Sequence, residues 1–172
     1  MLSDTECQQL LTALVDPVRH AGDKIMEIHA RGVVARKKPD GSTVSEADEA
    51  AEAILLQALA DLAPDIPVIS EENADSHSLA PSDEFFLVDP LDGTREFLRP
   101  DGNGAFTVNI GLIQHGAPVM GIVFAPALDR LFHGVVGLGA IEHSGGRSRK
   151  LEVRPVPLRL SLIHISEPTR PQ

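Results

Sequence analysis

The chain has 172 residues, 42% of them hydrophobic, and a formal net charge of −10. That length is enough for one domain with a sizeable core, and the composition is typical of a soluble globular protein. The negative charge argues against a nucleic-acid polymer or an anionic membrane as the partner. The sequence has no long apolar run, so we expect no transmembrane segment and a cytoplasmic location.

The N-terminal part predicts two amphipathic helices. In the first, apolar residues recur at spacings of three and four, at Cys7, Leu11, Leu14, Val18, Ala21, Ile25 and Ile28. Pro17 predicts a kink or a second helix start, and the single cysteine is expected to be a buried thiol. The second helix is expected from Glu46 to Leu62, with a buried face made of Ala47, Ala51, Ile54, Ala58 and Leu62.

Asp48 lies at the start of this second helix and has two interpretations. Ser45 at the N-cap and an acidic residue at the third helical position come close to a capping box. Capping therefore explains Asp48 on local grounds, and a role in chemistry is the alternative.

Two predicted strands end in carboxylates. Residues 66–70 are followed by Glu71, and residues 85–88 are followed by Asp89-Pro90-Leu91-Asp92-Gly93-Thr94. The proline predicts that the second strand ends at Asp89. Ligands of open α/β sheets bind outside the carboxyl ends of the strands, and Mg²⁺ prefers oxygen ligands.

An ordinary turn is the alternative for an isolated Asp-Pro-x-Asp-Gly sequence. Together, however, Glu71, Asp89 and Asp92 would repel one another without a cation. The cluster therefore favours a bound metal ion.

The second half predicts an antiparallel meander, with strands at 105–113, 118–124 and 130–136 and a turn at 137–140. One more strand at 151–160 would be confined to an edge by its two prolines. Residues 159–172 continue no pattern. We expect a folded domain over residues 1–158 and a non-native or disordered tail over residues 159–172.

These motifs resemble the signature of the inositol monophosphatase superfamily of metal-dependent, lithium-sensitive phosphatases. The resemblance extends over Lys38-Pro39-Asp40-Gly41-Ser42, Ser45-Glu46-Ala47-Asp48, Ser70-Glu71-Glu72, Asp89-Pro90-Leu91-Asp92-Gly93-Thr94 and Phe106-Thr107-Val108-Asn109-Ile110, all in the family's order. The continuation Arg95-Glu96-Phe97-Leu98 is most similar to the 3'(2'),5'-bisphosphate nucleotidase branch, of the CysQ type. The resemblance implies an α/β fold, an α+β layered sandwich, of which this chain would be the N-terminal portion.

The resemblance also implies roles for particular residues. Glu71, Asp89 and the carbonyl of Leu91 match the ligands of a first Mg²⁺, and Asp89 and Asp92 match ligands of a second. Asp48 and Thr94 match the pair that orients and deprotonates the attacking water, with Glu71 beside them in the catalytic group. A small phosphate ester is expected to bind at Glu71, Leu91, Asp92, Gly93 and Thr94.

The sequence departs from the family in one respect. Family members carry a Trp-Asp-x-Ala-Ala-Gly-like motif in their second half, and this chain has no Trp. We therefore expect a chain truncated at its C-terminus. The expected activity is Mg²⁺-dependent hydrolysis of adenosine 3',5'-bisphosphate to AMP and phosphate, with Mn²⁺ as an alternative cofactor. The alternatives are an inositol or sugar phosphate phosphatase, an inactive truncated fragment, and a structural domain whose acids only form caps and turns. The sequence fixes no oligomeric state.

Overall fold

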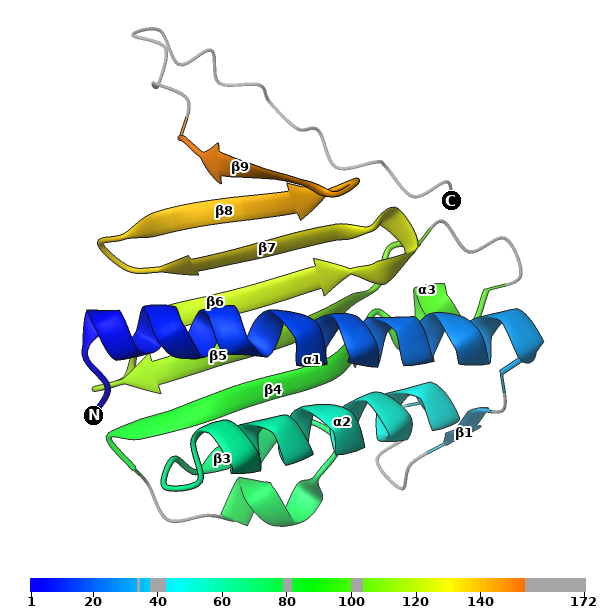
Figure 1. Cartoon of the computed structure of the whole chain (residues 1–172). Coiled ribbons are helices and arrows are strands. Elements are labelled where there is room, and N and C mark those ends of the chain that lie inside the picture. The colour runs from blue at the N-terminus through cyan, green and yellow to red at the C-terminus, as the bar shows by residue number, and fades with distance from the viewer. Residues whose placement is uncertain (34, 38–42, 79–81, 100–103, 154–172) are drawn as a thin grey trace, which may run out of the picture.

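The structure is a computed structural model and describes residues 1–33, 35–37, 43–78, 82–99 and 104–153. It is a mixed α/β fold in which helices pack on one large sheet (Figure 1). The helical elements are α1 (Asp4–Arg31), α2 (Glu46–Leu62), α3 (Thr94–Phe97) and two 3₁₀ helices, η1 (Ala74–Ser78) and η2 (Pro126–Leu128). The strands are β1 (Ala35–Lys37), β2 (Thr43–Ser45), β3 (Val68–Ser70), β4 (Glu84–Asp92), β5 (Thr107–Gln114), β6 (Ala117–Ala125), β7 (Arg130–Val135), β8 (Gly139–Ser144) and β9 (Arg147–Leu151).

The large sheet has seven strands in the order β3-β4-β5-β6-β7-β8-β9. Strands β3 and β4 are parallel, and every later neighbour is antiparallel, which confirms the predicted meander. A separate two-stranded sheet joins β1 to β2. The parallel pair matters for function because it brings the carboxyl ends of two strands to the same edge.

The two long helices lie side by side on the same face of the large sheet, α1 over β5, β6 and β7, and α2 over β4 (Figure 1). All seven apolar residues predicted for the buried face of α1 are buried. The helix continues through Pro17 without a second start and ends at Gly32, which has a φ of 91°. Cys7 is buried as predicted, and burial raises the pKa of its thiol. No helix in the described part of the chain is long and apolar enough to cross a membrane.

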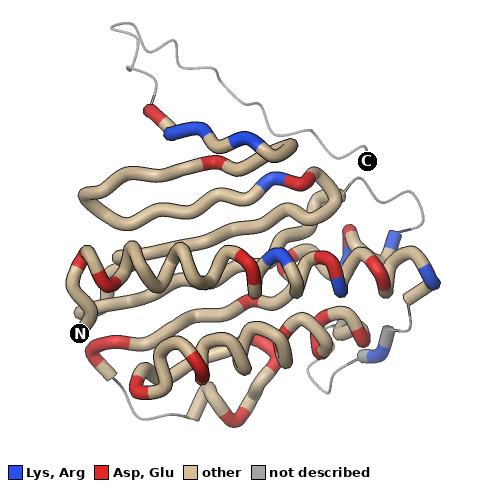
Figure 2. Tube along the Cα trace, in the orientation of Figure 1, with Lys and Arg blue, Asp and Glu red and all other residues tan. Residues whose placement is uncertain are grey.

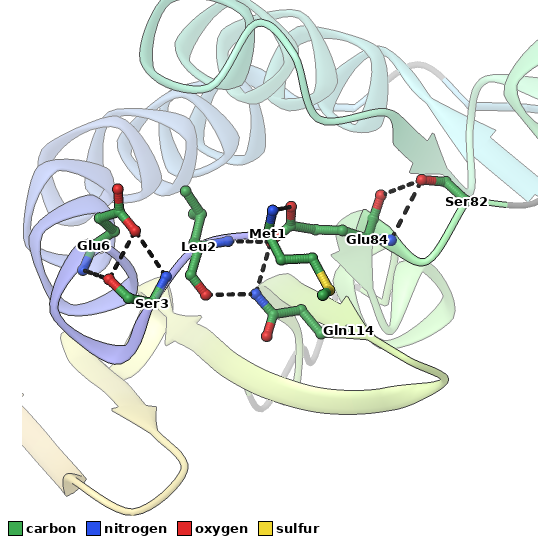
Figure 3. Close-up of polar contacts among 7 residues, drawn as sticks. All are labelled: Met1, Leu2, Ser3, Glu6, Ser82, Glu84 and Gln114. Atoms are coloured by element: carbon green, nitrogen blue, oxygen red, sulfur yellow. Dashed lines mark hydrogen bonds and ion pairs between the residues drawn. The ribbon is translucent and has the colours of Figure 1, made fainter.

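The beginning of α1 is tied to the sheet through Glu84 at the start of β4 (Figure 3). Its Oε1 accepts hydrogen bonds from the backbone N–H of Leu2 at 2.8 Å and from Nε2 of Gln114 at 2.7 Å. Partial burial acts to raise the pKa of Glu84, but these hydrogen bonds and the charge of the N-terminus together lower it. The carboxylate therefore joins the N-terminus, β4 and β5 in its charged form.

The end of β4 differs from the sequence-based expectation. β4 does not end at Asp89 but continues through Pro90 to Asp92. Its register with β5 shifts between Asp89 and Asp92, so the proline lies in an irregularity where the ladder needs no N–H donor. The 3₁₀ helix η1, which follows β3, was also not predicted.

The end of the described chain contains two strands that the sequence did not predict, β8 and β9. Most of the strand expected at 151–160 lies outside the described residues and stays a prediction. Gly145 and Gly146 both have positive φ, at 55° and 72°, and form the two-residue turn between these strands. Figure 2 shows that β9 carries a row of basic residues at one edge of the sheet. The expected tail at 159–172 lies outside the described residues and stays a prediction.

The buried face of α2 is also rotated relative to its prediction. Leu55 and Leu59 are fully buried, whereas Ile54 and Ala58 are half-buried and Leu62 is 42% exposed. Two predicted positions, Ala47 and Ala51, are buried. Rotation toward Leu55 also brings Asp48, which is only 1% exposed, to the sheet side of the helix.

This rotation predicts how two leucine substitutions differ. Leu59→Ala should lower the free energy of unfolding by about 2–5 kcal/mol because it deletes a fully buried side chain. Leu62→Ala, the matched control on the next turn, should cost less than about 1 kcal/mol. Urea denaturation of both variants measures this difference. A larger loss in Leu62→Ala than in Leu59→Ala would show that the predicted face, and not the observed one, is buried.

Candidate active site

Asp89 and Glu71 lie side by side because β3 and β4 are parallel neighbours. Ser70 is opposite Val88 in the register, so the next residues along the two strands are also adjacent. The backbone N–H of Glu71 donates to the carbonyl of Val88 at 3.0 Å. The prediction that two strands deliver carboxylates to one sheet edge is confirmed.

Asp89 is the electrostatic centre of this edge. Burial, followed by the negative charges of Glu71 and Asp92, raises the pKa of Asp89 to about 7. One of its oxygens, Oδ1, is buried and has no hydrogen-bond partner among the described residues. A buried carboxylate oxygen without a donor suits a cation, because a cation would compensate both the burial and the repulsion.

The residues at this edge fit a hard cation in their chemistry. Carboxylates of Glu71, Asp89 and Asp92 and the carbonyl of Leu91 are all oxygen donors of the kind that Mg²⁺ binds. Glu71 and Asp92 have exposed side chains, whereas Asp89 is half-buried. Within the described ranges, no three Cys, His, Asp or Glu side chains form a ready-made metal site. The side chain of Glu71 already hydrogen-bonds to Asp89, and the charge of Asp92 acts on Asp89 as well.

A hydroxyl and a carboxylate meet beside the acidic cluster. Oγ1 of Thr94, at the start of α3, lies 3.2 Å from Oδ1 of Asp48 and 3.2 Å from the carbonyl oxygen of Leu91. A hydroxyl has a single proton, so it donates to one of these acceptors at a time. Thr94 thereby connects α2 to the end of β4.

The two interpretations of Asp48 are compatible because its two oxygens have different partners. Oδ2 accepts from the backbone N–H of Ser45 at 2.8 Å and from Oγ of Ser45 at 2.6 Å, which completes the capping box. Oδ1 remains for Thr94. Capping thus fixes the carboxylate in place while one oxygen stays directed at the site.

Gly93 permits the turn between β4 and α3. Its φ of 91° lies in the region that favours glycine, and a Cβ at this position would lie 2.6 Å from the carbonyl oxygen of Ala105. The carbonyl of Gly93 accepts from the N–H of Phe97 at 2.9 Å. Phe97 is buried against Phe106 and His29, so it anchors α3 and orients Thr94.

Sequence analysis missed the residues that hydrogen-bond to Ser70, the residue before Glu71. Ser70 is fully buried, and its hydroxyl donates to Oε1 of Glu52 in α2. Its carbonyl lies 2.8 Å from Nε2 of His77 in η1. Glu52 follows Asp48 by four residues, one helical turn, and that spacing is the signal in the sequence that both acids share one face of α2.

Comparison with known proteins identifies the class of this arrangement. The model of the inositol monophosphatase family matches residues 6–169. The chain therefore belongs to the inositol monophosphatase family. This result confirms the resemblance and the α/β fold class.

Individual relatives place the chain near one branch of that family. It is 40% identical over 148 residues to the 3'(2'),5'-bisphosphate nucleotidase CysQ of Salmonella typhimurium (strain LT2), an alignment that covers 84% of this chain and 59% of the relative. The structure of CysQ from Bacteroides thetaiotaomicron has a TM-score of 0.63 at 34% identity, covering 87% of this chain and 53% of that one. The extragenic suppressor protein suhB from Bartonella henselae has a TM-score of 0.68 at 30% identity, covering 78% and 52%. The chain thus spans less than two thirds of the curated relatives it matches.

The raised pKa of Asp89 predicts how the metal-free chain responds to pH. A carboxyl with a higher pKa in the folded than in the unfolded state binds a proton preferentially when folded, so stability falls as pH rises toward about 7. In EDTA, the melting temperature of the wild type should be several degrees lower at pH 8 than at pH 5.5. The melting temperature of Asp89→Asn, which carries no charge at this position, should fall less over the same range. Added Mg²⁺ should raise the melting temperature at pH 8 in the wild type only. Identical profiles for the two proteins would contradict a strained, cation-binding Asp89.

Proposed function

We propose that this chain carries the metal-binding and water-activating part of a Mg²⁺-dependent phosphomonoesterase. The observation that carries the proposal is the hydroxyl of Thr94, which lies 3.2 Å from Oδ1 of Asp48 and 3.2 Å from the carbonyl oxygen of Leu91, between the acidic residues Asp89 and Asp92 in the chain. Metal dependence, usually on Mg²⁺, is general in the family to which the chain belongs. Bound Mg²⁺ would supply Lewis-acid stabilisation of the phosphoryl oxygens and would make water easier to deprotonate.

The residues of the chain would divide the remaining work. Glu71, Asp89, Asp92 and the carbonyl of Leu91 would hold the cation. Thr94 would accept a hydrogen bond from the attacking water while it donates its own proton toward Oδ1 of Asp48. The water oxygen forms the new bond to phosphorus while its proton passes through the Thr94 hydroxyl to Oδ1 of Asp48, the ester bond breaks, and the leaving oxygen takes a proton from solvent. The backbone at Gly93, which a side chain would block, would lie against the phosphate.

The substrate that the relatives favour is adenosine 3',5'-bisphosphate, hydrolysed at its 3'-phosphate. Curated relatives at 34–40% identity carry the name 3'(2'),5'-bisphosphate nucleotidase CysQ. A second candidate is an inositol phosphate, because a structural neighbour at 28% identity is an inositol monophosphatase from Anabaena, with a TM-score of 0.62.

Phosphate release from both substrates tests this function. We expect release from adenosine 3',5'-bisphosphate that requires Mg²⁺, is inhibited by Li⁺ and is lost in Asp89→Asn. Faster release from inositol 1-phosphate would transfer the proposal to the second substrate. If the folded wild type releases no phosphate from either substrate, the chain belongs to the family but lacks the proposed activity.

Substitutions of Thr94 test proton transfer separately from metal binding. Thr94→Ala should lower kcat by about 10²–10⁴-fold, because it removes the hydroxyl beside Asp48. Thr94→Ser, which keeps the hydroxyl, should retain most of the activity, and Mg²⁺ affinity should be unchanged in both variants. The measurement is kcat at saturating Mg²⁺ with calorimetric titration of the metal. If Thr94→Ala were as active as wild type, the Asp48–Thr94 pair would be a structural contact only.

A further inference from the structure

Ser70, the residue before Glu71, has all of its polar groups hydrogen-bonded although it is fully buried. Its backbone N–H donates to Oγ of Ser76 at 3.0 Å, and its hydroxyl donates to Oε1 of Glu52. Its carbonyl accepts from Nε2 of His77 at 2.8 Å and from the backbone N–H of Asn73 at 3.3 Å. We refer to Ser70, Glu52, Ser76 and His77 as the Ser70 clamp.

The partners of Ser70 come from two different elements. Glu52 extends from α2, and Ser76 and His77 lie in η1. A carbonyl oxygen only accepts hydrogen bonds, so the Nε2 atom of His77 that contacts it carries the proton. The end of β3 is therefore fixed from both sides, by a helix and by the segment that follows the strand.

The clamp is separate from the cluster that would hold the cation, yet it is adjacent to it in the chain. The side chain of Glu71 is exposed, so packing around that side chain does little to fix it. What fixes Glu71 is its backbone: its own N–H bonds to Val88, and the preceding residue is clamped. Metal affinity depends on groups that orient the ligands, and loss of such groups typically costs 10–100-fold.

We propose that Glu52 and His77 are positioning residues that act through Ser70 to hold Glu71 at the distance from Asp89 that a divalent cation requires. This inference rests on the proposed function, since it assigns Glu71 to the metal site. Glu52 makes no contact with the cation in this scheme. Its role is to determine where the end of β3 lies, and the role of His77 is the same from the opposite side.

Alanine and glutamine variants distinguish positioning from general stabilisation. Glu52→Ala and His77→Ala remove the hydrogen bonds to Ser70. Glu52→Gln keeps an acceptor oxygen without the charge, and His77→Gln keeps an N–H donor. Asp61→Asn is the matched control, because it removes one negative charge from the far end of α2.

Calorimetric titration with Mg²⁺ is the main readout. The two alanine variants should bind Mg²⁺ about 10–100-fold more weakly than wild type. Their kcat should recover at saturating Mg²⁺, so that the defect appears in the metal requirement and not in the rate. The glutamine variants and Asp61→Asn should bind Mg²⁺ with an affinity close to that of wild type.

Hydrogen exchange provides a readout that needs no metal. The amide of Glu71, which is bonded to Val88, should exchange faster in both alanine variants, whereas the amide of Ile110 in β5 should not change. If an alanine variant does not fold, Ser76→Ala, which removes the acceptor for the N–H of Ser70, replaces it.

The outcomes separate this inference from the proposed function. Alanine variants with wild-type Mg²⁺ affinity, beside an Asp89→Asn variant that has lost it, would overturn the clamp and leave the proposed function intact. A wild type that takes up no Mg²⁺ would overturn both. Glutamine variants as impaired as the alanine variants would show that the hydrogen bonds to Ser70 are not the cause.

Discussion

Repulsion between carboxylates is the constraint on which the rest of this site depends. Asp89 is half-buried between Glu71 and Asp92, and burial together with those two charges raises its pKa to about 7. Left alone, the three side chains would move apart or one would keep a proton. The fold prevents separation at the backbone, because the parallel register of β3 and β4 makes Glu71 and Asp89 neighbours. The scaffold thus holds together groups that only a cation or a proton can make compatible.

Helix α2 supplies much of the rigidity that this arrangement needs. Asp48 and Glu52 lie one turn apart, and each contacts a different wall of the site: Asp48 reaches Thr94, and Glu52 reaches Ser70. The helix is in turn fixed at its start by the capping box of Ser45 and along its length by fully buried leucines. Helix α2 therefore sets the spacing between the end of β3, which is followed by Glu71, and the start of α3, where Thr94 lies. Such a link ties the stability of the core directly to the geometry of the site.

The sequence predicted the parts of this structure that depend on local chemistry. The face of α1, the capping box and the strands ending in acids follow from spacing and residue type, and all are present. The errors arose where tertiary context decided. Pro90 is tolerated because β4 is irregular there, and α2 is rotated by its packing against the sheet. Ser70 and His77 escaped notice because the contact between them depends on how the η1 segment folds back, which no pattern in the sequence encodes.

The short α3 segment bears on how such a site distinguishes its substrates. The sequence Arg95-Glu96-Phe97-Leu98 is the part of the motif that most resembles the 3'(2'),5'-bisphosphate nucleotidase branch. Phe97, however, is buried in an aromatic cluster with Phe106 and His29, so it anchors the segment and cannot face a ligand. Arg95, by contrast, is exposed one residue after Thr94, and under the proposed function its positive charge would suit a substrate with a second phosphate better than one with a single phosphate. Under the proposed function, Thr94 would act on the attacking water, and Arg95, the next residue in the chain, would act on the charge of the substrate.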